Sequence, residues 1–357
     1  MTATGFAIVG GGWRTDFFLR AAKELPDRLR VTGVLARDPA RRERMTSAWG
    51  VPCRATLDEL LADRPEFVVV ATPWAVTPEL LRELHSRGVP ALAETPPAPD
   101  RDGLRGLRDL DRAGARIQVA EQYQFQPLHA ARLALVASGR LGRVTEAQVS
   151  VAHGYHGLDL IRRFLGVTAE PVTITARRFR SSIVAGPDRQ GPPDRERDAE
   201  SVQTIALLDF DGRLGLFDFA DDQYFSWIRA LRLVVRGERG EIVDTTARYL
   251  LDARTPVSVE LVRRDAGENG NLEGLFHSGI TAGEEWLYRN PFGAARLTDD
   301  EIAVATCLVR MGEYVNGGAV FSSLADAAQD HHLGLAVDEA AVSGQTIRIA
   351  GHIWETD

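Results

Sequence analysis

The sequence predicts an α/β fold in which a doubly wound parallel sheet precedes a second, α+β domain with a mostly antiparallel, open sheet. A glycine-rich turn between an apolar run and a helix opens the chain, and short apolar runs then alternate with helical segments. In the second half, strand-like runs follow one another across short turns. A chain of 357 residues suits two domains, expected at 1–122 and 123–357, with the last helices packing back on the first domain.

The opening turn indicates a dinucleotide-binding site. The apolar run Phe6–Val9 stops at three glycines, and a helix is expected from Phe17 to Leu25. Gly10 and Gly12 take the first two positions of the fingerprint G-x-G-x-x-G, whose third position is Thr15. Gly10 permits a tight turn, and the missing Cβ of Gly12 lets a pyrophosphate approach the helix N-terminus. A turn without a ligand is the alternative. The expected cofactor-binding residues here are Gly10, Gly12, Trp13 and Arg14.

The next strand, expected at 31–36, indicates which cofactor would bind. An acidic residue at this strand end normally meets the ribose of NAD, but here Ala36 is followed by Arg37. A small residue before an arginine suits the 2′-phosphate of NADP, and Arg41 follows one helical turn later. NADP is therefore the expected cofactor, while Asp38 keeps NAD as the alternative. Plain surface charges are the competing interpretation of both arginines.

Two further strand ends should contribute to the same site. The apolar run 67–71 has the composition of a strand buried on both faces, and it ends at Thr72, Pro73 and Trp74. A strand at 90–94 ends at Glu94 and is followed by Thr95. Ligands of such sheets bind at the carboxyl ends of strands, so we expect cofactor contacts from these five residues. The remaining helices of this domain are expected at 39–49, 57–61 and 78–87, with one more that follows the loop 95–99 and ends at Ala113. Strands are expected at 52–54 and 117–120.

The second half has the pattern of an antiparallel sheet with a few helices. Runs rich in Val, Ile and Phe are separated by turns such as Asp211-Gly212. The polar, Pro- and Gly-containing insert 186–199 is expected to be a mobile loop. The predicted strands are 143–152, 172–180, 201–210, 213–220, 230–236 and 256–262, and the predicted helices are 127–139, 156–165, 299–316 and 324–343.

Composition excludes several classes of function. A net charge of -8 without a basic stripe argues against a nucleic-acid partner. No apolar run reaches the roughly 18 residues of a membrane span, and no signal peptide is expected, so a cytoplasmic location is predicted. Cys53 and Cys307 are far apart in the sequence and are interpreted as reduced thiols. No set of residues has the spacing of a zinc site, so no metal is expected.

The order of these features along the chain resembles the Gfo/Idh/MocA oxidoreductase family. The resemblance implies an N-terminal Rossmann domain that binds NAD(P). It also implies a sugar-, cyclitol- or similar polyol-like small-molecule substrate. The open face of the second sheet would then pack against another subunit, giving a homodimer or homotetramer. The matching segments are Gly10–Gly12, Ala71-Thr72-Pro73, Glu94-Thr95-Pro96, Pro127, Gly139-Arg140-Leu141-Gly142, His156-Gly157-Leu158-Asp159 and Asp299-Asp300-Glu301-Ile302.

Departures from the family pattern concern the chemistry. The family usually carries Glu-Lys-Pro at the fifth strand, and its Lys helps to move the substrate proton. This chain has Thr95 at that position, and Thr cannot act as a charged acid or base. Ala152 stands where the family tends to have an Asp, and Thr77 stands where a His is usual. Gln124 or a neighbour replaces an Arg that is common before Pro127.

The remaining candidates for catalysis are His153, Tyr155, His156 and Asp159. In a helix over 156–165, His156 and Asp159 share a face, and a His oriented by a carboxylate can take a proton from a hydroxyl. Structural alternatives remain: a capping or buried-pair role for Asp159, and a lining role for His153 and Tyr155. His331 and His332 are interpreted as core-packing or subunit-contact residues.

Two classes of function follow. The first is an NAD(P)-dependent oxidoreductase acting on a hydroxyl or carbonyl of a small polar, sugar- or cyclitol-like molecule, with His156 as the leading acid–base group. The second keeps the fold without net redox chemistry. It would be either a lyase or glycoside-cleaving enzyme that uses its nicotinamide transiently, or a cofactor-free binding protein. Thr95 and Ala152 motivate this second class.

Overall fold

The computed structural model describes residues 3–268, 270 and 272–355. The chain forms two compact units. Unit 1 comprises residues 1–130, 263–280 and 288–328, and unit 2 comprises residues 131–262, 281–287 and 329–357. Each unit therefore combines separate stretches of the chain, unlike the continuous segments 1–122 and 123–357. The assignment of cofactor and substrate to separate domains stays a prediction.

Unit 1 contains the predicted doubly wound parallel sheet, which has six strands in the order β3-β2-β1-β4-β5-β6. Every neighbouring pair in this sheet is parallel. This order brings the carboxyl ends of β1, β2, β4 and β5 to one edge. The strands are β1 Thr4–Val9, β2 Leu29–Leu35, β3 Cys53–Arg54, β4 Phe67–Val70, β5 Ala91–Ala93 and β6 Ile117–Val119.

The first helix begins earlier than the sequence pattern predicts. Helix α1 spans Trp13–Glu24, and Gly12 is its N-cap with φ -80° and ψ 176°. Glycine is an acceptable N-cap residue, so the helix starts directly after the turn. The other helices that begin in unit 1 are α2 Pro39–Trp49, α3 Leu57–Ala62, α4 Thr77–Ser86, α5 Arg101–Gly106, α6 Arg108–Arg112, the 3₁₀ helix η1 Tyr123–Phe125, α7 Pro127–Ala137, α9 Asp299–Val315 and α10 Leu324–Ser343.

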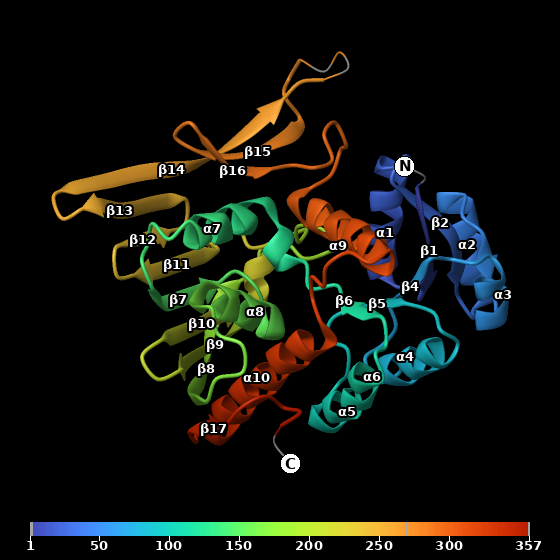
Figure 1. Ribbon diagram of the computed structural model, residues 1–357, viewed down its shortest axis with the longest axis horizontal. Coiled ribbons are helices and arrows are strands. Elements are labelled where there is room, and N and C mark those ends of the chain that lie inside the picture. The colour runs from blue at the N-terminus through green and yellow to red at the C-terminus, as the bar shows by residue number, and fades with distance from the viewer. Residues whose placement is uncertain (1–2, 269, 271, 356–357) are drawn as a thin grey trace. The chain divides into compact units, whose positions relative to one another are not determined.

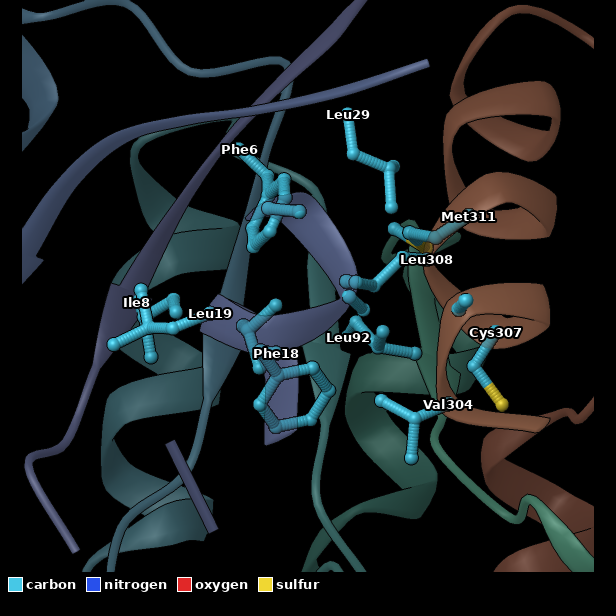
Figure 2. Close-up of a cluster of buried hydrophobic side chains, with 14 of the residues drawn as sticks. Phe6, Ile8, Phe18, Leu19, Leu29, Leu92, Val304, Cys307, Leu308 and Met311 are labelled. Atoms are coloured by element: carbon cyan, nitrogen blue, oxygen red, sulfur yellow. The ribbon is translucent and has the colours of Figure 1, made fainter. Parts of the chain in front are cut away.

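Helix α9 completes the core of unit 1 from near the end of the chain. Its Val304, Leu308 and Met311 are buried in the same cluster as Phe6 and Phe18 (Figure 2). Each fully buried side chain of this size contributes on the order of 2 kcal/mol. Thr298 caps the helix and shares a capping box with Glu301. The parallel sheet is therefore covered by α1 and α9 together (Figure 1).

The second sheet has 11 strands in the order β16-β15-β14-β13-β12-β11-β7-β10-β9-β8-β17. It confirms the prediction of a mostly antiparallel sheet, since β7 and β10 pair parallel while β8, β9, β11, β12, β13, β14 and β17 pair antiparallel. The strands are β7 Val144–Ser150, β8 Val172–Val184, β9 Asp198–Asp209, β10 Leu214–Ala220, β11 Arg232–Gly237, β12 Gly240–Val243, β13 Thr246–Asp252, β14 Thr255–Ala266, β15 Phe276–Ala282, β16 Glu285–Arg289 and β17 Ile347–Ile349.

Sequence reasoning missed five of these strands: β12, β13, β15, β16 and β17. Strands β13 and β16 carry exposed or half-buried side chains at most positions, so they lack the apolar runs on which the prediction relied. The insert at 186–199 is also shorter than predicted. Strand β8 extends to Val184 and β9 begins at Asp198, which leaves 185–197 as the tip of a long hairpin.

One face of the second sheet is covered and the other is open. Helix α8, Gly154–Leu165, packs closely on β10, because a Cβ at Gly215 would lie 2.6 Å from Cγ2 of Ile161. Helix α10, Leu324–Ser343, packs on α8 (Figure 1). On the opposite face, Phe179, Ile205 and Leu207 have 57%, 40% and 43% of their surface exposed. Across the described part of the chain, no helix is long and apolar enough to cross a membrane.

Candidate functional site

The glycine turn of unit 1 is built around a position that only glycine can occupy. Gly10 has φ +135°, and a Cβ there would lie 2.1 Å from the carbonyl oxygen of Ala71. The Gly10 N–H donates to the carbonyl oxygen of Leu35 at 3.1 Å. Gly10 therefore holds the ends of β1, β2 and β4 together at one edge of the sheet.

Gly12 leaves the N-terminus of α1 accessible. A Cβ at Gly12 would meet no atom of the described residues within 4 Å. As N-cap, glycine has no side chain to accept a hydrogen bond from the first N–H groups of the helix. These groups and the positive end of the helix dipole form a cradle that fits a phosphate. Thr15, at the third fingerprint position, is fully buried in the first turn and does not obstruct this cradle.

Arg14, a predicted cofactor-binding residue, turns toward an ion-paired cluster. Its Nε lies 3.0 Å from Oε2 of Glu94, and its Nη1 lies 3.7 Å from Oδ2 of Asp300. The guanidinium also lies over the ring of Phe17, 5.1 Å from the centroid. Burial raises the pKa of the Glu94 carboxyl, and Arg14 opposes that effect. Arg14 therefore holds the Glu94 carboxylate in place.

Glu94 presents one oxygen that lacks a hydrogen-bond partner among the described residues. Its Oε1 is buried at the carboxyl end of β5, while Oε2 pairs with Arg14. A buried acceptor without a donor is costly, and an amide N–H of a ligand would satisfy it. Near this pair, burial raises the pKa of the Cys307 thiol well above its ordinary value. Cys307 is thus kept protonated and is a poor nucleophile.

The other predicted residues of this edge lie in the turns after β4 and β5. The Oγ1 atoms of Thr72 and Thr77 are 2.9 Å apart, and the N–H of Val76 donates to the carbonyl oxygen of Pro73 at 2.8 Å. Thr77, which stands in place of the family's usual His, thus closes the turn. The half-buried Thr95 follows β5, and the half-exposed Trp13 and Trp74 also belong to this edge.

The end of β2 carries the residues expected to distinguish NADP from NAD. Asp38 is the N-cap of α2, and its Oδ1 accepts from the N–H of Ala40 at 3.0 Å. Arg37 is exposed. Arg41 lies against the glycine turn, since a Cβ at Gly11 would lie 2.7 Å from its Cδ. The carboxylate that favours NAD is therefore engaged in capping, and Arg41 lies beside the glycine turn.

The predicted catalytic residues of unit 2 form a group of aromatic rings at the start of α8. His153 is the N-cap, and its ring centroid lies 5.0 Å from that of His156 and 5.2 Å from that of Tyr155. The Tyr155 and His156 centroids are 4.4 Å apart. His331 of α10 meets Tyr155 edge-on at 5.6 Å, so it lies in this cluster. Sequence reasoning interpreted His331 only as a packing or subunit-contact residue.

Tyr224 is a second member that sequence reasoning missed. It ends the 3₁₀ helix η2, Asp221–Tyr224, and its Oη accepts from the backbone N–H of His153 at 2.9 Å. The same Oη lies 2.5 Å from Nδ1 of His153. The pKa of His153 is lowered to about 4, first by burial and next by His156. The charged groups that also act on it are Asp221, which raises its pKa, and Arg189, which lowers it.

Asp159 is part of a buried ion-pair network on the next turn of α8. Its Oδ1 and Oδ2 lie 2.7 and 2.8 Å from Nε of Arg163, which is the buried-pair role that the sequence left open. Arg162 forms an ion pair with Asp330 of α10. Burial raises the pKa of Asp330 well above its ordinary value, against the lowering effect of Arg162.

The described residues offer one further groove but no cluster suited to a metal ion. Between residues 3 and 355, outside positions 269 and 271, no three His, Cys, Asp or Glu side chains are grouped to hold a metal ion. A groove with a volume of about 520 Å³ lies on strands β11 to β14, lined by residues such as Arg236, Tyr249 and Pro256. None of the candidate catalytic residues lines this groove.

Comparisons with known proteins agree on the fold. Residues 4–121 match the model of an oxidoreductase family with an NAD-binding Rossmann fold. An inositol 2-dehydrogenase from Streptomyces avermitilis is 29% identical over 196 residues, which is 49% of this chain and 57% of that protein. The chain thus spans little more than half the length of this relative.

Solved structures extend the likeness to nearly the whole chain. An oxidoreductase from Agrobacterium radiobacter, in complex with NAD+, L-tartaric acid and magnesium, has a TM-score of 0.68 at 20% identity and covers 98% of this chain and 99% of its own. A levoglucosan dehydrogenase in complex with NADH and levoglucosan has a TM-score of 0.70 at 17% identity and covers 98% and 100%. At these identities the likeness concerns the fold.

Proposed function

Since residues 4–121 match the model of the Gfo/Idh/MocA family of oxidoreductases, we propose that the chain is a nicotinamide-dependent dehydrogenase of this family. Its substrate would be a small polar molecule with a hydroxyl or carbonyl group. The observation that carries this proposal is the open N-terminus of α1 at Gly12, on the same sheet edge as the unsatisfied Oε1 of Glu94. The N-terminus of α1 offers N–H donors to a pyrophosphate, and Oε1 of Glu94 offers an acceptor to a carboxamide N–H.

The residues of unit 1 would bind and orient the cofactor. The N–H groups at the start of α1 would hold the pyrophosphate, with Gly12 leaving room for it. Glu94, held by Arg14, would accept from the carboxamide N–H, and Thr72 to Trp74 and Thr95 would complete the edge. A bound nicotinamide accepts a hydride from, or donates one to, the substrate carbon.

His156 of unit 2 would carry the proton. Oxidation of an alcohol requires that the hydroxyl lose its proton while the hydride leaves the carbon, and a neutral imidazole is a suitable base near pH 7. In the reverse direction, the imidazolium returns the proton to the developing alkoxide. His156 is buried among Tyr155 and His153, which would hold its ring in place.

We propose NADP as the preferred cofactor and NAD as the alternative. Arg37 is exposed at the end of β2, and Arg41 lies against Gly11, so positive charge is available for a 2′-phosphate. Asp38 already accepts the N–H of Ala40. NADPH should therefore bind more tightly than NADH, and replacing Arg37 and Arg41 by serine should reduce this difference.

The substrate class rests on the named relatives. One relative is an inositol 2-dehydrogenase, and one structural neighbour was solved with levoglucosan. We propose a sugar- or cyclitol-like substrate, because polyols offer several hydroxyls to a cluster rich in imidazole and phenol groups. Cyclitols and anhydrosugars are accordingly the first compounds to test.

The decisive experiment combines binding and turnover. Fluorescence titration with NADPH and NADH tests the cofactor site, and failure of both to bind would exclude the dehydrogenase. His156→Ala should lower turnover by about 10²-fold or more while the Kd of the cofactor stays unchanged. Unchanged turnover in this variant would remove His156 from the mechanism.

A second candidate function is favoured by Thr95 and Ala152. The missing Lys and Asp of the family pattern suit an enzyme that uses its nicotinamide transiently, as a lyase or glycoside-cleaving enzyme would. Such a protein would retain nicotinamide through purification and form product without a net change in NADPH absorbance. A cofactor-free binding protein of the same fold would instead give a flat titration.

We also propose that the chain forms a homodimer or homotetramer through the open face of its second sheet. Phe179, Ile205 and Leu207 lie on that face, since Phe179 pairs with Gln203 and Leu207 with Thr175 in the β8–β9 register. A second copy would remove their apolar surface from water. Light scattering gives the mass, and Ile205→Glu should lower it if this face is the interface.

A further inference from the structure

The contact between Tyr224 and His153 has the form of an acid–base pair. The Oη of Tyr224 lies 2.5 Å from Nδ1 of His153 and also accepts the His153 backbone N–H at 2.9 Å. Both residues are half-buried. They come from η2 and from the start of α8, 71 positions apart, and they meet beside His156.

The protonation of this pair follows from its surroundings. Burial and His156 lower the pKa of His153 to about 4, so its imidazole is neutral at neutral pH. A phenol has an O–H to donate, whereas an unprotonated imidazole nitrogen can only accept. Two heteroatoms 2.5 Å apart must share one proton. The phenol is therefore the donor, Nδ1 is the acceptor, and the imidazole carries its own proton on Nε2.

The position of the phenol oxygen also favours a negative charge on it. Helix α8 is 12 residues long, and Oη accepts the N–H of its N-cap residue. The N-terminus of a helix stabilises an anion through its N–H groups and its dipole. A phenolate that forms transiently at this point is stabilised by the backbone, while Nδ1 takes up the displaced proton.

We propose that Tyr224 is a catalytic acid–base residue of the dehydrogenase and that His153 is the residue through which it acts. In this assignment Tyr224 takes the role given above to His156, so the two residues are alternative acceptors of one proton. The proton of the substrate hydroxyl passes to Oη as the phenol proton passes to Nδ1, while the substrate C–H leaves as hydride to the nicotinamide. The step leaves a carbonyl product, a neutral tyrosine and an imidazolium, which then releases its proton to solvent. In a chain with Thr95 at the family's Lys position, this pair supplies an acid–base group. The proposal rests on the proposed dehydrogenase function.

Tyr224→Phe tests the proposal by removing one oxygen atom. We expect kcat to fall by about 10²-fold with an unchanged Kd for NADPH. The solvent isotope effect on kcat should also decrease, because one of the two transferred protons is lost. Tyr249→Phe on β13 is the matched control and should leave both quantities unchanged. His153→Gln can still accept the phenol hydrogen bond but cannot take up a proton, so it should show the same loss, and it decides the matter if Tyr224→Phe does not fold.

The outcomes separate this inference from the function on which it rests. If the wild-type protein binds no nicotinamide and turns over no polyol, the dehydrogenase proposal fails. If the wild type is active and Tyr224→Phe stays within about threefold of it with the same isotope effect, Tyr224 has only a structural role. A fall in kcat with an undiminished solvent isotope effect would likewise overturn the proposal.

Discussion

The sheet edge of unit 1, at which we propose that the cofactor binds, and the imidazole–phenol cluster of unit 2 are assembled in different ways. This cluster consists of His153, Tyr155, His156, Tyr224 and His331. At the edge, the residues follow the ends of β1, β2, β4 and β5, which are neighbours in one parallel sheet. In the cluster, His153 and His156 on α8 meet Tyr224 from η2, while His331 from α10 meets Tyr155. The edge of unit 1 thus gathers its residues at the aligned ends of parallel strands, whereas the cluster of unit 2 gathers them from two helices and a 3₁₀ helix.

The two units also bury charge differently. In unit 1, Arg14 lies between Glu94 and Asp300, with side-chain exposures of 13% for Arg14 and 15% for Glu94. In unit 2, Arg162 and Asp330 have side-chain exposures of only 7% and 4%. A buried ion pair contributes little net stability, but removing one partner leaves an uncompensated charge. The deeper pair should therefore be the more sensitive to substitution.

The largest expected effect is on the free energy of unfolding after Arg162→Met. Loss of this guanidinium leaves Asp330 buried without its partner and should cost about 3–5 kcal/mol. Arg14→Met should cost less, because its partners are more exposed. Arg178→Met is the control, since its pair with Asp338 has exposures of 32% and 64% and should contribute at most about 1 kcal/mol. Denaturant unfolding measures all three, and equal losses would contradict the distinction.

The next effect is the pH dependence of stability that comes from His153. Its pKa in the folded protein is about 4 and lies below the ordinary value of 6.5, so the unfolded chain binds the proton more tightly. The stabilisation is complete above about pH 6.5 and is lost as pH falls to about 4, a change of about 3 kcal/mol. Unfolding of wild type and His153→Gln across this range measures it, and parallel curves would contradict it.

Glu94 in unit 1 should give the opposite sign. Burial raises its pKa, so the folded protein binds this proton more tightly than the unfolded chain does. Its contribution is present below the unfolded pKa, about 4.3, and is lost as pH rises through the folded value. In the wild type, Glu94 should make stability fall as pH rises, whereas His153 should make stability rise. Glu94→Gln should abolish the first trend, and His153→Gln should abolish the second.

The smallest expected effect is on cofactor affinity after Gly12→Ala. The new methyl group meets no protein atom of the described residues within 4 Å, so stability should change by no more than about 1 kcal/mol. The methyl would occupy the space proposed for the pyrophosphate and should weaken NADPH binding at least about tenfold, or about 1.4 kcal/mol. Titration measures the Kd, with His156→Ala of unit 2 as the control. Unchanged affinity would move the phosphate site away from Gly12.

The turns and strand ends at this sheet edge could be predicted because local patterns determine them, while their role in cofactor binding stays a prediction. The sequence pattern indicates the tight turn at Gly10 and the strand end at Glu94. The structure adds the close approach of Gly10 to Ala71 and the ion pair of Glu94. The ion pair of Arg14 with Glu94 could not be predicted, since it depends on how α1 turns against β5. Asp38 was the residue that kept NAD as the alternative cofactor, and local sequence also suits it to cap α2 before Pro39.

The cluster in unit 2 could be predicted only in part. His153, Tyr155 and His156 are near neighbours in the sequence, so their proximity was visible. Tyr224 was not, because its contact with His153 spans 71 positions and depends on the register of a mixed sheet. Strand β13 was missed for a related reason: four of its seven residues are exposed, so period and hydrophobicity no longer mark a strand.

The position of α9 has a consequence for how the protein is made. Unit 1 begins at the N-terminus, yet its core includes Val304, Leu308 and Met311, which leave the ribosome after strands β7 to β13 of unit 2. The apolar side chains of β1 and α1 therefore stay without their α9 contacts during most of synthesis. Domains usually fold in the order in which they emerge, but here unit 1 cannot be completed until most of unit 2 has been made. A chain cut after residue 262 would expose that unfinished core to association with other chains.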